Sequence, residues 1–182
     1  MKNLTFFLIM AISLLFTACG SPAEEELNRD QLSGLIQEME SNFQQQLGQV
    51  GVDTAAARTM VEKAEEFARR FPRDTLAPKF LFQAANVSRG IGDFERSASL
   101  WGQIASDYEN YQRAPEALFF QAFTLDNDLD DAVRAIPKYE SFLLRYPKHP
   151  IARDAALLLE AAKSGKSADD MVKEFQQKQQ DE

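Results

Sequence analysis

Two sequence markers recur along this chain with the same spacing, and the period limits the possible fold more than any other feature. Phe71, Tyr108 and Tyr146 recur at nearly equal intervals, each at the end of an amphipathic stretch. The pair Ala77-Pro78 returns one such interval later as Ala114-Pro115. Periods in the thirties are typical of arrays of helical hairpins, in which stacked neighbours bury the apolar face that one hairpin cannot bury alone. We therefore expect an all-α fold.

Residues that begin and end helices occur where this period requires them. Pro78 and Pro115 suit the first turn of a helix, where an amide lacks a partner anyway. Gly92 before Asp93 fits a helix end followed by a new N-cap. Apolar residues recur at three- and four-residue spacings, which predicts helices at about 31–48, 54–70, 78–89, 94–107, 115–126, 131–145, 150–163 and 168–178.

Two further features of the sequence concern the later helices. Gly165 and the Ser167 to Asp170 capping pattern predict a helix end and a new start near the C-terminus. Pro137 falls inside a predicted helix, and it predicts a kink at 134–136 because proline removes a backbone hydrogen bond and clashes with the preceding turn.

The N-terminus, residues 1–18, is predicted to be a signal peptide. The uncharged run from Leu4 to Ala18 is shorter than the roughly 20 residues that cross a bilayer as a helix. The run leads into Phe16-Thr17-Ala18-Cys19-Gly20, which resembles the box at which bacterial lipoproteins are cleaved and acylated on the cysteine. The alternative is a secreted protein cut after Ala18, with Cys19 a free thiol.

The lipoprotein resemblance implies an anchored protein. Several hydrocarbon tails on Cys19 make membrane attachment stable. Gly20 stands where aspartate favours inner-membrane retention in similar proteins, so the resemblance implies the outer membrane of a Gram-negative bacterium, facing the periplasm. Residues 19–30 are expected to form a flexible tether, because proline, small residues and three glutamates bury little apolar area. Residues 31–179 are expected to form one helical domain.

The clearest repeats, 54–163, resemble tetratricopeptide repeats. The large, small and turn positions of that family are occupied by Leu81, Ala85, Gly92-Asp93-Phe94, Ser97, Trp101 and Ile104, and again by Leu118, Ala122, Ala135 and Tyr139. Ala-Pro after an aromatic-Pro ending resembles the tetratricopeptide repeat lipoproteins of the bacterial cell envelope, of the BamD-like and Tol-Pal-associated type. The resemblance implies a short right-handed solenoid with a concave groove, and it places Phe82, Asn86, Arg89, Phe119 and Phe123 there as partner-binding residues.

Composition argues against several other functions. The formal net charge of −8 disfavours nucleic acid, since binding to phosphate backbones needs surplus cations. With one cysteine, the chain cannot form an internal disulfide or a metal site of several cysteines. With one histidine, it has little of the commonest general base for acid–base catalysis. We therefore expect no enzyme, no cofactor and no metal.

Three polar groups have a functional and a structural interpretation. His149 lies in a predicted loop, where an exposed linker residue is favoured over a ligand. The acidic run Asp126, Asp128, Asp130 and Asp131 lacks the glycine and glutamate of a calcium loop, so turn and capping roles are favoured. Basic residues that could bind an anion fall in last helical turns, where they complement the helix dipole: Arg69, Arg70 and Arg145.

The sequence leaves two functions open. The first is a lipid-anchored scaffold or adaptor that binds another cell-envelope protein or peptide, in outer-membrane assembly or envelope maintenance. The second is a homo-oligomeric spacer that pairs through the helix at 32–47. That helix carries an apolar seam of Leu32, Ile36, Met39, Phe43 and Leu47, which fits either a coiled coil or packing onto the first hairpin.

Overall fold

The structure is a computed structural model that describes residues 26–46, 53–165 and 177. Across those residues it is all-α and contains no strand. Its elements are α1 (Arg29–Gln46), α2 (Thr54–Arg70), α3 (Ala77–Gly90), α4 (Phe94–Asp107), α5 (Ala114–Phe123), the π-helical turn η1 (Thr124–Asp128), α6 (Ala132–Arg145) and α7 (Ala152–Ser164). Where the boundaries predicted for these helices fall on described residues, they are confirmed to within about two residues, except that the helix predicted at 115–126 ends in η1. The end predicted at 48 for the first helix lies outside the described residues. The signal peptide at 1–18 and all but one residue of 168–178 lie outside the described residues.

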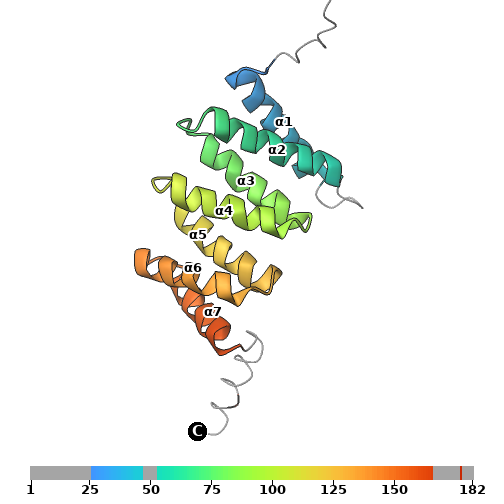
Figure 1. The fold of residues 1–182 in the computed structure, drawn as a ribbon. Helices are drawn as coiled ribbons and strands as arrows, with labels where there is room; N and C mark the ends of the chain where they lie inside the picture. The colour runs from blue at the N-terminus through green and yellow to red at the C-terminus, as the bar shows by residue number, and fades with distance from the viewer. Residues whose placement is uncertain (1–25, 47–52, 166–176, 178–182) are drawn as a thin grey trace, which may run out of the picture.

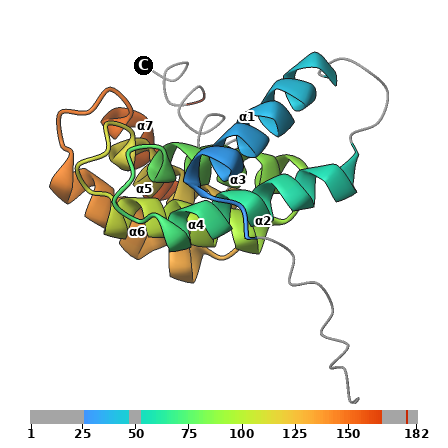
Figure 2. The ribbon, with the colours of Figure 1, turned by 90° about the horizontal axis from the view of Figure 1, so that it is seen from above.

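Helices that follow one another in the chain pack against one another, so the molecule is an elongated stack (Figure 1). Seen along the stack, the helices form two layers (Figure 2). We call α1, α3, α5 and α7 the odd layer, and α2, α4 and α6 the even layer. Every connection therefore carries the chain from one layer to the other.

The three loops that lead from the even layer to the odd layer share one backbone conformation. The C-cap residues Phe71, Tyr108 and Tyr146 have φ of −127°, −128° and −131° and ψ of 56°, 47° and 52°. Each cap amide donates to the carbonyl four residues earlier, and each cap carbonyl accepts from the amide three residues later at 2.8 to 3.0 Å. The repeat interval of the sequence is therefore also a repeat of the backbone, and we use it below to compare equivalent positions.

The second repeat interval is one residue longer than the first because an extra residue is accommodated at the end of α5. The π-helical turn η1 holds that residue, since a π turn contains one residue more than an α turn. Beyond it, Asp130 adopts the left-handed conformation with φ of 52°, and Gly92 does so at the equivalent place of the preceding hairpin with φ of 77°. An aspartate thus replaces the glycine that the second hairpin lacks, because aspartate tolerates this region better than most side chains.

The buried side chains form two clusters. The first joins α1, α2, α3, α4 and the Ala117 position of α5 around Phe67, Phe80 and Trp101, and the second joins α4, α5, α6 and α7 around Tyr139 and Phe142. The half-buried Phe120 packs against both clusters. The stack therefore has a core that is continuous through one aromatic ring.

Helix α1 begins two residues earlier than predicted because Asn28 caps it. The Asn28 side chain accepts from the amides of Asp30 and Gln31 at 3.0 Å, and the Gln31 side chain accepts from the amide of Asn28 at 2.9 Å. Reciprocal bonds of this kind satisfy the amides at a helix start. Leu27, which falls within the predicted tether, packs against the first core cluster.

Helix α6 continues through Pro137, which is exposed near the start of the helix. The proline therefore does not end the helix, and the kink at 134–136 stays a prediction.

Candidate protein-binding face

Two of the five residues expected to contact a partner are core residues. Phe82 is 2% exposed, and its ring meets that of Trp101 edge-on at 4.5 Å between centroids. Phe119 is 8% exposed and lies against the rings of Tyr139 and Phe142. Both rings point from the odd layer toward the next helix of the even layer, so the prediction that they line a groove is wrong for this structure.

The other three predicted residues lie nearer the surface, on α3 and α5. Asn86 is exposed, and its side-chain amide donates to the carbonyl of Phe82 at 3.0 Å. Arg89 donates to Asp128 from Nε at 2.5 Å and from Nη2 at 3.1 Å, and its guanidinium lies 5.0 Å from the ring centroid of Phe123. The hydrogen bonds to Asp128 hold the pKa of Arg89 above its usual value. The Arg89 charge is therefore already paired, whereas Asn86 is exposed and Phe123 is partly exposed.

The sequence prediction missed Phe120. This side chain is half-buried, with its ring 5.2 Å from Trp101 and 5.6 Å from Phe119. Gln83 occupies the equivalent position on α3, one repeat earlier. The polar Gln83 at the equivalent position is the sequence signal that the Phe120 position lies partly at the surface. The partly exposed aromatic side chains of α5 are therefore Phe120 and Phe123.

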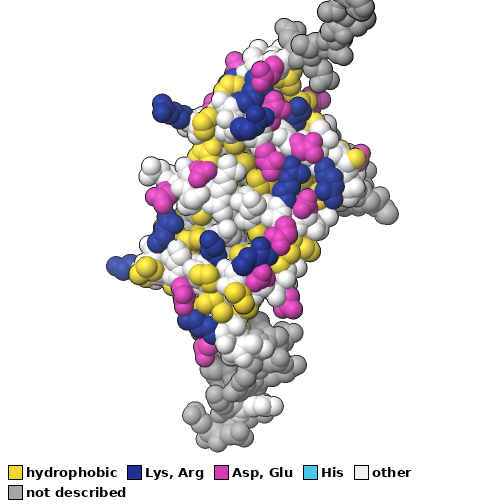
Figure 3. Space-filling view, in the orientation of Figure 1, with side chains coloured by type: hydrophobic (Ala, Val, Ile, Leu, Met, Phe, Trp, Pro, Cys, Tyr) yellow, Lys and Arg dark blue, Asp and Glu magenta, His cyan; other side chains and the backbone are white. Residues whose placement is uncertain are grey.

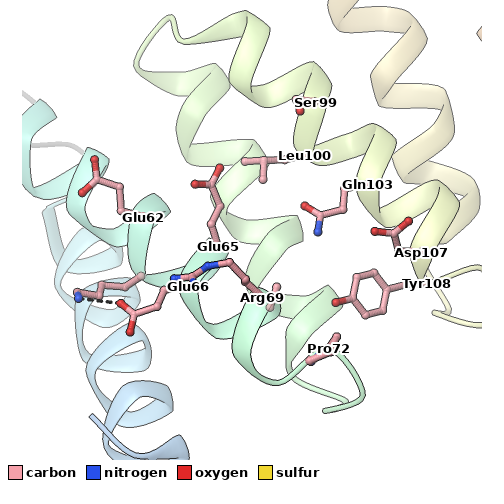
Figure 4. Close-up of a pocket in the computed structure, with 12 residues that line it drawn as sticks. Glu62, Glu65, Glu66, Arg69, Pro72, Ser99, Leu100, Gln103, Asp107 and Tyr108 are labelled. Atoms are coloured by element: carbon pink, nitrogen blue, oxygen red, sulfur yellow. Dashed lines mark hydrogen bonds and ion pairs between the residues drawn. The ribbon is translucent and has the colours of Figure 1, made fainter. Parts of the chain in front are cut away.

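The even layer carries a separate, open groove of about 800 Å³ between α2 and α4. It is lined by Glu62, Lys63, Glu65, Glu66, Ala68, Arg69, Pro72, Ser99, Leu100, Gln103, Asp107 and Tyr108. Figure 4 shows Gln103 of α4 and Tyr108, the residue that follows α4, facing Arg69 and Glu65 of α2 across it. Figure 3 shows acidic and basic side chains side by side over this part of the surface.

Several charges of this groove are paired within the chain. Arg96 holds Glu65 through two hydrogen bonds of 3.0 and 2.7 Å, which raise the pKa of Arg96. Lys63 donates to Glu66 at 2.9 Å and thereby lowers the pKa of that carboxyl. Of the described residues that line the groove, none is a histidine or a cysteine. The pair of Glu65 and Arg96 joins α2 to α4, and the pair of Lys63 and Glu66 lies within α2.

The other polar candidates have structural contacts. Asp131 caps α6 by accepting from the amide of Arg134 at 3.0 Å, and Asp126 lies 3.4 Å from the hydroxyl of Tyr139, which donates to it. The capping role predicted within this acidic run is confirmed for Asp131. His149 lies in the turn before α7, where its ring meets that of Phe142 edge-on at 5.6 Å. Within the described ranges, no group of three or more histidine, cysteine or acidic side chains is placed to hold a metal ion.

Two of the three arginines considered for an anion site are paired with acidic side chains. Arg70 bonds Glu66 at 2.8 Å and the carbonyl of Leu27 at 2.7 Å, and Arg145 bonds Glu109 at 3.0 Å. Arg69 lies apart from them in the groove of the even layer. The three cations therefore do not form a single site.

The apolar seam of α1 is used inside the chain. Leu32 and Ile36 are fully buried, and Met39 and Phe43 pack against the same cluster, which includes residues of α2 and α3. Leu47, the last residue of the seam, and Cys19 lie outside the described residues. Packing onto the first hairpin, one of the two interpretations of this seam, is therefore what the structure shows for its described part.

No family model matches the chain, and no curated protein matches it significantly. The helices of the described residues are also too short or too polar to cross a membrane.

Proposed function

We propose that this chain is a lipid-anchored tetratricopeptide repeat scaffold that binds another cell-envelope protein through its odd layer. The repeated loops, the two helical layers and the contact of Ser97 with α3 support the repeat assignment. The Ser97 hydroxyl donates to the carbonyl of Ala85 at 2.9 Å in the core, so two small residues let α3 and α4 approach closely. The activity proposed is binding, without a chemical reaction.

One observation carries this proposal. Phe120 and Phe123 keep part of their aromatic surface exposed on α5, one turn apart, and the exposed amide of Asn86 lies on the neighbouring helix of the same layer. An apolar strip beside polar side chains suits an extended or helical segment of another protein. Aromatic residues of this kind often supply much of the binding free energy in protein interfaces.

The anchor is proposed to be Cys19, with the protein held on the outer membrane of a Gram-negative bacterium and facing the periplasm. Outer-membrane assembly and envelope maintenance are the processes that the family resemblance suggests. We expect metabolic labelling with a fatty acid to mark the chain and to disappear in Cys19→Ala. Labelling that persists in the variant would contradict the anchor.

Photo-crosslinking in living cells tests the binding face. A photoreactive residue placed at Asn86 should give a discrete adduct with another envelope protein, and Phe123→Ala in the same chain should reduce its yield about tenfold, in line with the loss of a central interface residue. Ser99 provides the matched control, because it is exposed on the even layer at a similar height in the stack. Equal adducts from both positions, or none from Asn86, would refute the proposed face.

The second candidate function is a homo-oligomeric spacer joined through the helix at 32–47. The burial of Leu32 and Ile36 against α2 and α3 leaves their side chains unavailable to another copy unless α1 detaches. Sedimentation velocity distinguishes the two functions, since the scaffold should be a monomer at every concentration tested and the spacer should not.

A further inference from the structure

The two most exposed large hydrophobic side chains of the described residues lie on one face of α6. Val133 is 85% exposed and Leu144 is 83% exposed. The exposed Pro137 lies on the same face, since the three positions are separated by four and seven residues. We call these three residues the α6 ridge. Figure 3 shows hydrophobic side chains at the surface over the lower part of the stack, where Figure 1 draws α6.

The α6 ridge points away from the core. Val133 lies two positions before the buried Ala135, and Leu144 lies two positions after the buried Phe142. Residues two positions apart lie on nearly opposite sides of a helix, because successive residues turn by about 100°. The ridge therefore faces outward from the even layer.

Only α6, among the three helices of the even layer, carries apolar side chains at these positions. The equivalent residues of α4 and α2, one and two repeats earlier, are all exposed and are all polar or charged: Glu95, Ser99, Ser106, Arg58, Glu62 and Arg69. A position that accepts a charge in two repeats gains no packing inside the chain from a valine or a leucine. The α6 ridge thus has the composition of a surface that contacts something outside the chain.

Basic side chains run along one side of the ridge, although the formal net charge of the chain is −8. Each ridge residue is followed directly by a basic residue, and these are Arg134, Lys138 and Arg145. Since successive residues turn by about 100°, the three form a row beside the ridge. On the other side of the ridge, Glu140 is paired with Lys163 of α7 at 2.6 Å, which offsets its negative charge.

Two positive charges beside the ridge are not paired within the described part of the chain. Arg134 and Arg145 pair with glutamates in and just after α4, at 2.7 and 3.0 Å. In contrast, no ion pair among the described residues involves Lys138 or Lys148, which lies in the turn after α6. The surface around the ridge is therefore apolar at its centre and carries uncompensated positive charge at its border.

We propose that the α6 ridge rests on a bilayer surface that contains anionic headgroups. Val133 and Leu144 meet the acyl chains at the boundary of the headgroup layer, and Lys138 and Lys148 meet the headgroups. Helices that lie on a membrane combine an apolar face with basic side chains in this way. Anionic headgroups attract basic segments close to the surface.

The shape and charge of the even layer favour a bilayer at this place. A ridge needs a matching groove in a protein partner, whereas a fluid bilayer accepts it without one. The α2 helix has Glu62 where α6 has Pro137, and three more acidic residues line the groove beside it, so an anionic surface repels that part of the layer. The contact is separate from the proposed function, and it leaves the odd layer on the other side of the stack open to a partner (Figure 2).

Quenching of tryptophan fluorescence by brominated lipids tests the contact in the full chain. The native Trp101 is 1% exposed and lies in the core, so it adds a constant background. In vesicles of brominated phosphatidylcholine with about 30% phosphatidylglycerol, Leu144→Trp should be quenched at least about twice as strongly as Ser106→Trp, because its indole lies near the acyl chains. Ser106 is the matched control, since it is the equivalent exposed position of α4.

The contribution of charge is measured in the same vesicles. Replacing Lys138 and Lys148 together by glutamine should bring the quenching of Leu144→Trp down to the level of Ser106→Trp, and about 0.5 M salt should do the same by screening. Replacing Arg73 and Lys79 by glutamine is the control, because it removes the same charge from exposed positions away from α6. This pair should leave the quenching unchanged.

Two results would overturn the proposal. Equal quenching of Leu144→Trp and Ser106→Trp would leave the ridge to a protein partner. Equally strong quenching in purely zwitterionic vesicles would show that the basic residues contribute nothing. The contact does not need acyl chains on Cys19, so the difference should persist in Cys19→Ala with vesicles in excess, which separates its failure from failure of the anchor.

Discussion

Gly92 and Asp130 occupy equivalent positions and adopt the same left-handed backbone, with φ of 77° and 52°. Such a conformation costs a residue with a Cβ about 1 to 2 kcal/mol. Two hairpins of one chain therefore meet the same turn requirement with different residues, and only one of them carries the glycine that marks such a turn in a sequence.

Gly92→Ala should lower the free energy of unfolding by about 1 kcal/mol or more, because alanine is strained at positive φ. Gly90→Ala should instead raise it by about 0.5 to 1 kcal/mol, since Gly90 ends α3 with open space around its Cβ position. Urea unfolding followed by circular dichroism gives both values. Equal changes in the two variants would show that the backbone at Gly92 is not the cause.

Among the described carboxylates of the second hairpin, Asp126 has the environment that most clearly favours the protonated form. Burial raises its pKa, and this effect outweighs the hydrogen bond that the Tyr139 hydroxyl donates to it at 3.4 Å, which acts in the opposite direction. A raised pKa in the folded state means that the stabilising contribution is complete below the unfolded pKa of about 3.9 and is lost as the pH rises through the folded pKa.

Asp126→Asn removes this titration. The variant should therefore gain stability relative to the unmodified chain as the pH rises from 4 to 7, as measured by urea midpoints at each pH. Asp154→Asn, at an exposed position of α7, should show a smaller change. A variant that loses relative stability over this range would contradict the burial of Asp126.

At the scale of the element, α1 has the weakest connection to the repeat pattern, yet it is integrated into the core through Leu32 and Ile36. Ile36→Ala should lower the free energy of unfolding by about 2 to 5 kcal/mol, because it leaves a cavity against α2 and α3. Glu38→Ala, on the exposed side, should change it by less than about 0.5 kcal/mol. The loss at Ile36 should be the same at every protein concentration, and a concentration-dependent loss would instead indicate an interface between copies.

The π-helical turn η1 gives a second prediction for an element. Deletion of the exposed Asn127 should lower the free energy of unfolding by less than about 2 kcal/mol. The deletion removes the extra residue and gives the second repeat interval the length of the first. Deletion of Gln103 in α4 should unfold the chain, since it rotates Ile104 out of the core. Thermal unfolding of both deletion variants measures the difference. An equal loss of stability in the two variants would refute the assignment of the extra residue to η1.

At the scale of the whole molecule, Phe120 links the two core clusters. Phe120→Ala should let α6 and α7 exchange with solvent before α2 and α3, because stability in a stack depends on contacts between neighbours. Phe123→Ala is the control, since Phe123 packs only against the second cluster. Exchange that rises uniformly over all helices in Phe120→Ala would show that the clusters are coupled by other contacts.

Much of the fold could be predicted from local features, whereas the candidate site could be predicted only in part. Pro78, Pro115 and Asp131 act on the backbone within one helical turn, so the helix starts that they predict are confirmed. Phe82 and Phe119 were assigned to a surface because a helix has several faces and local spacing does not state which neighbour covers each. Phe120 became identifiable only when α3 and α5 were compared at equivalent positions.

The sequence by itself determined the helices, their period and most of their ends, because these depend on backbone preferences and hydrogen bonds among residues close in the chain. Only the tertiary structure decided which aromatic residues are buried, how α1 is used and where the extra residue of the second hairpin is accommodated. Those outcomes depend on contacts between residues far apart in the sequence, such as Phe82 with Trp101 and Phe119 with Tyr139. The free energy of such contacts is set by packing in space and leaves little trace in local spacing.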